Sequence, residues 1–223
     1  MISKQIKWTK YLWLSLIIFG AFLLEYFSLF VIEMFILRMD IFNYTANQRT
    51  MHHFIMVFLW IIYIGSILLY SHKRYAFPIK SNHSVISRKD WIISLLCLFG
   101  CKVMTFIDWH TLKVIGEAQG KTVIQFISQY LYYFLEVGIV LLIIIYGHKA
   151  FETLYKKEIS IPIGGFVLAM TWGIFHFVSR GVGIEVWNGI SCVIFSILSG
   201  IMYIKLDRNY VYSYLFIAIG YLL

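Results

Sequence analysis

Charged residues are scarce in this chain of 223 residues. Only 13% of them are Asp, Glu, Lys or Arg, whereas 61% are hydrophobic. A soluble domain of this length could not remove so much apolar surface from water, so the composition excludes a soluble globular protein and predicts an integral membrane protein. The polar gaps between the apolar runs are too short to fold independently. We therefore expect one integral membrane domain covering residues 1–223.

Proline and cysteine are also rare, with two and three copies in the chain. Cys97, Cys101 and Cys192 all fall inside apolar runs rather than in loops. This placement indicates neither a disulfide framework nor a cysteine-based zinc site. Pro162 stands at the start of an apolar run, where its missing N–H would have no partner in the first helical turn.

Long apolar runs fill most of the sequence and predict an all-α, polytopic membrane bundle. A helix needs about 20 residues to cross roughly 30 Å of hydrocarbon. By this criterion we expect about seven transmembrane helices, and a count of six to eight fits the pattern; the expected segments are 11–37, 54–71, 91–107, 122–147, 161–179, 186–204 and 210–223.

The positive charges are distributed unevenly between the two sides of this predicted bundle. Thirteen Lys and Arg residues fall in the amino terminus and the alternate gaps, against five in the opposite gaps. The positive-inside rule then predicts a cytoplasmic amino terminus and an external carboxyl terminus. Abundant Ile, Lys, Tyr and Phe suggest a bacterial source, so we expect a multi-pass protein of the bacterial plasma membrane.

The net charge of +8 follows from this asymmetry. The cations occupy separate loops at the membrane edge instead of one patch, so nucleic-acid binding is not indicated. Membrane lipids are the expected partners, and the cationic loop 71–89 is expected to lie against anionic headgroups.

Ionisable residues inside apolar segments are costly and therefore mark candidate functional sites. Five stand out: Glu25, Glu33, Lys102, Glu136 and His176. Glu136 and His176 are equidistant from the short loop between their segments, so in an antiparallel hairpin they lie at similar depth. Such a pair could share a proton, hold a metal or activate water. The alternative is that each only offsets the burial cost of its neighbour through hydrogen bonds.

Three further residues are candidates for a supporting or substrate-binding role. Trp172 and Arg180 lie four residues before and after His176, so all three share one helix face. Arg180 also suits an interfacial anchor. Gln129 lies outward of Glu136 and could line a polar site or bond a neighbouring helix.

The other polar residues give weaker expectations. Glu25 and Glu33 are eight residues apart, or about 80° around an α-helix, so we expect no tight pair. The adjacent His52 and His53 point in different directions and do not suggest a joint metal site. Glu117 is expected in a solvated outer loop.

Glycines in the apolar segments predict sites where two helices approach closely. They are the Gly164–Gly165 pair, Gly138 and Gly200.

The segment from about 125 to 223 resembles the CPBP family, the CAAX-processing and bacteriocin-processing intramembrane proteases, which include the Abi proteins. The family pattern comprises EExxxR, then FxxxH, then a histidine followed four residues later by Asn or Asp. The clearest match is Trp172-Gly-Ile-Phe-His176, with tryptophan in place of phenylalanine. Glu136 matches the leading glutamate. Val137 and Leu141 replace the second Glu and the Arg, and the last segment contains neither His nor Asn.

This resemblance implies an intramembrane peptidase that acts on a membrane-associated peptide or a prenylated protein. Glu136 would activate water and His176 would support it, with Tyr212 and Tyr214 as candidate donors. A divalent metal such as zinc is one candidate cofactor, although the sequence supplies no full ligand set. Glu25 or His52 could also replace missing groups.

The alternative is a non-catalytic CPBP relative that binds a membrane partner, for example as an immunity or stress-associated protein. A transporter is a third hypothesis, based on the buried glutamates.

Overall fold

The computed structural model describes residues 6–75, 77, 85–178 and 183–223, and the described residues form helices without any strand. In chain order the elements are α1 (Trp8–Phe27), the π-helix η1 (Ser28–Ile36), α2 (Ala46–Tyr75), α3 (Arg88–Trp109), α4 (Lys113–Ala118), α5 (Val123–Tyr155), α6 (Ile163–Leu168), the π-helix η2 (Ala169–Gly173), α7 (Val186–Lys205) and α8 (Tyr210–Leu222). The prediction of an all-helical bundle is confirmed.

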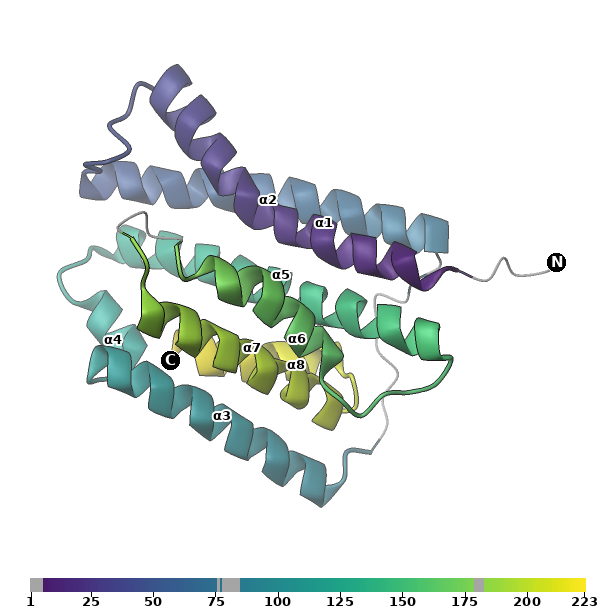
Figure 1. Ribbon diagram of the computed structural model, residues 1–223. Coiled ribbons are helices and arrows are strands. Elements are labelled where there is room, and N and C mark those ends of the chain that lie inside the picture. Colours follow the sequence, from purple (N-terminus) through teal and green to yellow (C-terminus); the bar gives the residue numbers. More distant parts are fainter. Residues whose placement is uncertain (1–5, 76, 78–84, 179–182) are drawn as a thin grey trace.

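Helix α5 forms the centre of the bundle. It contacts α1 and α2 on one side and α6 and α8 on the other, and α3 packs outside α7 and α8 (Figure 1). Side chains around the whole circumference of α5 are buried, including Ile139, Ile143 and Ile144. A helix that is apolar on all faces is typical of the core of a bundle or of a membrane span.

Local sequence signals explain where α5 begins and ends. Thr122 and Gln125 form a capping box, in which the Gln125 side chain accepts from the Thr122 amide at 2.9 Å and Thr122 accepts from the Gln125 amide. The helix stops at Lys156, whose backbone is left-handed with φ 54°. The helix extends beyond the predicted membrane segment 122–147, and His148 and Ala150 remain buried against neighbouring helices.

All seven predicted segments coincide with helices, but only five of the described helical segments have the length and composition to cross a membrane. These five are Trp8–Ile36, Ala46–Tyr75, Arg88–Ala118, Val123–Tyr155 and Val186–Lys205. The other two, Ile163–Gly173 and Tyr210–Leu222, are apolar but shorter.

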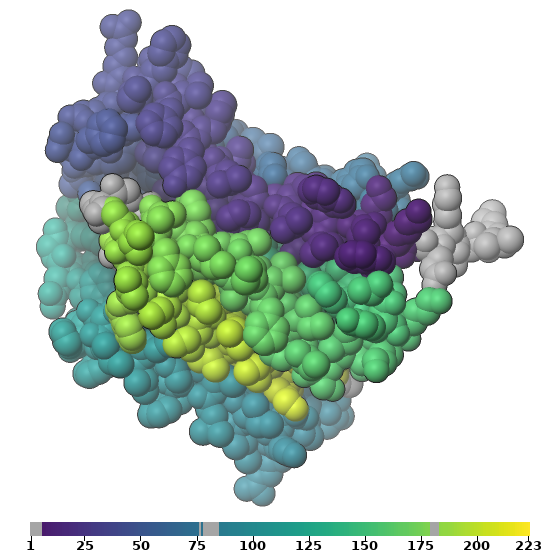
Figure 2. Space-filling model, viewed as in Figure 1, coloured from purple at the N-terminus to yellow at the C-terminus, as the bar shows by residue number. Residues whose placement is uncertain are grey.

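The first predicted segment is not one straight helix. Past Phe27 the chain continues as η1, and the segment bends away from α5 (Figure 1). The resulting arm stands out from the rest of the molecule (Figure 2) and exposes large apolar side chains such as Phe35 and Phe42. π-Helical turns widen the helix and are frequent at functional sites.

Glycines allow α6 to pack closely against α5 and α7. A Cβ on Gly164 would lie 2.2 Å from the Ile144 carbonyl oxygen, and one on Gly200 would lie 2.6 Å from the Cα of Gly165. The prediction of close contact at these three glycines is confirmed. At Gly138 it was wrong, because a Cβ there would meet no atom within 4 Å.

Candidate functional site

Glu136 lies in the middle of the bundle and is 5% exposed. Its carboxylate accepts hydrogen bonds from two side chains of other helices, the Trp172 indole Nε1 at 3.4 Å and the Tyr221 hydroxyl at 2.9 Å. Helices α5, η2 and α8 therefore meet at this carboxylate. Of the two tyrosines expected as candidate donors, Tyr214 donates to the backbone of α5, at the Phe134 carbonyl.

His176 approaches the same cluster through Trp172 rather than through Glu136. Its Nδ1 lies 2.8 Å from the Trp172 carbonyl oxygen, and the two rings are 4.2 Å apart. Within the described residues, no hydrogen bond or ion pair joins His176 to Glu136. Trp172 therefore contacts both residues: its ring packs against the His176 imidazole, and its indole N–H donates to the Glu136 carboxylate. The third member of the predicted helix face, Arg180, lies outside the described residues.

Gln129 belongs to a series of hydrogen-bonded side chains that lies closer to the start of α5 than Glu136 does. Its amide donates to the Tyr133 hydroxyl at 2.8 Å, and that hydroxyl donates to Glu117 at 2.8 Å. The Lys113 ammonium lies 4.5 Å and 4.1 Å from the ring centroids of Tyr133 and Tyr221, which links this chain to the Glu136 cluster. The prediction of a solvated Glu117 was wrong, because α4 folds back and buries it at 4% exposure.

A second buried cluster surrounds His52 on the other side of α5. The Nδ1 of His52 lies 2.9 Å from Glu33, and its Nε2 lies 3.5 Å from Glu25. Glu33 is completely buried and also accepts from Ser28 at 2.5 Å and from Tyr44. Every oxygen of Glu33 therefore has a partner.

Sequence reasoning missed this grouping for a geometric reason. The 80° separation of Glu25 and Glu33 assumed α-helical geometry, but Glu33 lies in η1, where hydrogen bonds run from residue i to i+5. The two glutamates do not pair directly; they share His52 from α2. The only sign of this cluster in the sequence was the presence of ionisable side chains in apolar segments.

Tyr44 remains a hydrogen-bond donor to Glu33 at neutral pH. Its burial, and in second place its hydrogen bond to Glu33, raises the pKa of its phenol.

Tyr132 connects the two clusters across α5. Its hydroxyl donates to Glu25 at 3.4 Å, and it lies one helical turn from Glu136. In the described chain, Glu25 and His52 make no hydrogen bond to Glu136 or His176, so they do not replace the missing family residues by direct contact. Nor do the described residues contain a group of three or more His, Cys, Asp or Glu side chains arranged to hold a metal ion.

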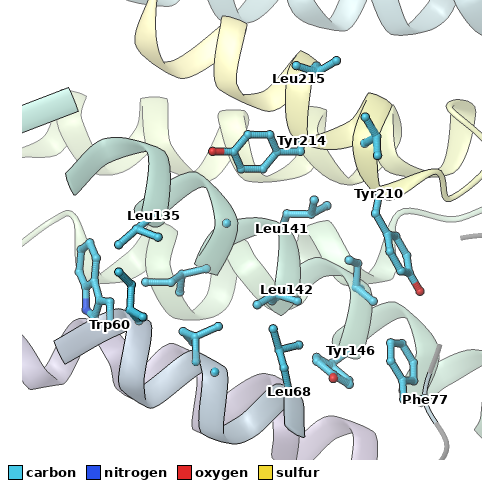
Figure 3. Close-up of a pocket in the computed structure, with 17 residues that line it drawn as sticks. Trp60, Leu68, Phe77, Leu135, Leu141, Leu142, Tyr146, Tyr210, Tyr214 and Leu215 are labelled. Atoms are coloured by element: carbon cyan, nitrogen blue, oxygen red, sulfur yellow. The ribbon is translucent and has the colours of Figure 1, made fainter. Parts of the chain in front are cut away.

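A cavity of about 570 Å³ lies between α2, α5 and α8. Its walls are almost wholly apolar. Trp60 closes one end, and Phe77, Tyr146 and Tyr210 surround the other (Figure 3).

Two glycines contribute to the cavity wall, one from each of two helices. A Cβ on Gly65 or on Gly138 would meet nothing within 4 Å. Glycine lowers helix stability by about 1 kcal/mol relative to alanine, and packing does not require it at either position. These two positions therefore keep the cavity open.

Comparison of the chain with family models, curated proteins and solved structures gives no match.

Proposed function

We propose that this protein is a multi-pass bacterial plasma-membrane protein with seven membrane segments and a cytoplasmic amino terminus. The asymmetry of Lys and Arg supports this topology. The start of α1 and the end of α8 also lie at opposite ends of the bundle (Figure 1). The helices Ile163–Gly173 and Tyr210–Leu222 are only about 17 and 20 Å long at 1.5 Å per residue, so the bilayer thins around them.

Within this bundle the protein binds a membrane molecule in the cavity between α2, α5 and α8 and does not cleave it. The cavity itself carries this proposal. It has a volume of about 570 Å³, almost wholly apolar walls and an opening at the surface of the bundle. Ligand sites in proteins are mostly apolar clefts of about 300–1,000 Å³. A membrane molecule with an apolar part therefore fits this space. Of the two alternatives that follow from the resemblance to the CPBP family, an active peptidase and a non-catalytic binding protein, we propose the second.

The polar clusters support binding over hydrolysis. A general base must be within reach of the proton that it removes. Both oxygens of Glu136 are already bonded, to Trp172 and Tyr221, and the Nδ1 of His176 is directed to a backbone carbonyl. In this arrangement Trp172 and Tyr221 occupy the carboxylate oxygens that a general base would need.

Binding is tested by thermal unfolding of the purified protein in detergent, with and without added phospholipid. A ligand that binds only the folded state raises the melting temperature. We expect this rise for the wild type and none for Gly138→Leu, which fills the cavity. Leu96→Phe, on the exposed face of α3, is the control and should respond like the wild type. An equal rise in Gly138→Leu would refute the cavity as the site.

Cleavage is tested separately by comparing the peptide termini of membrane proteins from cells that express the wild type or Glu136→Gln at matched abundance. The control is Glu158→Gln, whose side chain is 86% exposed. We expect three indistinguishable sets of termini. Termini that disappear only in Glu136→Gln would establish an intramembrane peptidase instead.

A further inference from the structure

We infer that the cavity holds one acyl chain of an anionic phospholipid, with the headgroup at the end formed by Phe77, Tyr146 and Tyr210. This inference rests on the proposed function, because it identifies the membrane molecule that the cavity binds. The orientation proposed above assigns that end to the cytoplasmic leaflet.

The length of the cavity fits a chain from one leaflet. Along α5 the lining runs from Leu135 to Tyr146, which is about 16 Å at 1.5 Å per residue. Half of a hydrocarbon core of roughly 30 Å is about 15 Å. A single acyl chain that enters beside Tyr146 therefore ends near Trp60.

The chemistry of the walls favours a hydrocarbon chain over a peptide. In an apolar medium every backbone N–H and C=O of a bound peptide would need a partner. The indole N–H of Trp60 already donates to the Ala21 carbonyl at 2.7 Å, and the Tyr214 hydroxyl donates to Phe134 at 2.9 Å. The wall between them is aliphatic or glycine, and an acyl chain requires no polar partner there.

Incompletely bonded polar groups lie at the proposed headgroup end. The hydroxyls of Tyr146 and Ser71 are fully buried beside each other, and neither bonds to any other group in the described part of the chain. Even if one hydroxyl donates to the other, one of the two protons has no acceptor, whereas buried polar groups are nearly always hydrogen-bonded in native proteins. Tyr146 lines the cavity, so a lipid ester oxygen at this end would provide that acceptor.

Two cations lie at the same end. Lys73 and Arg74 are exposed at the end of α2, about one to two turns beyond Leu68, and the described residues provide no carboxylate for either. By contrast, Lys205 and Arg208 are paired with Asp90 and Glu152. Lys73 and Arg74 attract a headgroup with a net negative charge, so an anionic phospholipid should bind more tightly than a zwitterionic one.

The inference is tested by native mass spectrometry of the protein released from nanodiscs that contain equal amounts of phosphatidylglycerol and phosphatidylcholine with identical acyl chains. We expect one lipid retained per protein, with ~30-fold enrichment of phosphatidylglycerol from two nearby cations. The double variant Lys73→Gln/Arg74→Gln should retain one lipid but lose the enrichment. Its matched control, Arg88→Gln/Lys89→Gln, removes two exposed cations at the start of α3 and should keep the enrichment.

Cavity filling separates this site from lipid adsorbed elsewhere. Gly138→Leu and Gly65→Leu should each abolish the retained lipid, and both have open space for the new side chain, so an unchanged helical content is expected. Retention of lipid by both folded variants would overturn the site.

The two proposals fail in different ways. Equal retention of the two headgroups by the wild type would overturn the anionic ligand, while loss of both in Gly138→Leu would leave the proposed binding function standing. No retained lipid in the wild type, together with no thermal response to phospholipid, would overturn both.

Discussion

Replacing His52 by alanine should destabilise the protein far more than the same change at the adjacent His53. His52 contacts two glutamates, the fully buried Glu33 at 2.9 Å and the partly exposed Glu25 at 3.5 Å. His53 makes one hydrogen bond, to the Ser128 hydroxyl at 3.2 Å. Both imidazoles also pack near the ring of Tyr132, and His52 additionally packs near the ring of Tyr44.

The expected magnitudes follow from these contacts. Removing one partner of a buried ionic cluster costs about 3–5 kcal/mol, because the remaining charge stays buried without compensation. Losing one hydrogen bond between neutral groups costs about 1 kcal/mol. His52→Ala should therefore cost roughly 2–4 kcal/mol more than His53→Ala.

The assay is equilibrium unfolding in mixed micelles with SDS as the denaturant, followed by the loss of helical circular dichroism. In a second step, Glu33→Gln is added to His52→Ala. It should recover part of the lost stability, because one uncompensated carboxylate is removed and effects within a contacting cluster are not additive. Equal losses for His52→Ala and His53→Ala, or no recovery, would refute the description of this cluster as a stabilising unit.

The remaining predictions concern packing and ion pairs, and detergent melting measures each of them. Gly164→Ala should prevent stable folding, because the new Cβ would lie 2.2 Å from a backbone oxygen of α5. Gly138→Ala should raise the stability by about 1 kcal/mol, because the new Cβ meets no atom and alanine favours the helix. A Gly164→Ala variant more stable than Gly138→Ala would contradict the assigned packing. Arg208→Ala should cost about 3 kcal/mol, since its partner Glu152 is largely buried. Lys205→Ala should cost less than about 1 kcal/mol, since both partners of its ion pair are partly exposed, and equal costs would count against this distinction.

The predictions for Glu136 and His176 show how far spacing along the chain can be used. Their equal distance from one loop correctly indicated a shared region of the bundle, since Trp172 contacts both. The chain pattern contained no information about which side chain each would bond. The partner Tyr221 comes from the last helix and was missed, because one tyrosine among sixteen carries no distinguishing signal in the sequence.

The sequence by itself determined that this is a helical membrane protein, because burial of apolar surface and the need to satisfy backbone groups depend on composition and run length alone. It also marked the ionisable residues that had to find partners. Only the tertiary structure decided which partners these were, how η1 brings Glu33 to His52, and that Gly65 and Gly138 face one cavity. Those outcomes depend on the rotation and crossing of helices that are distant in the chain, and residue spacing within a single helix does not specify them.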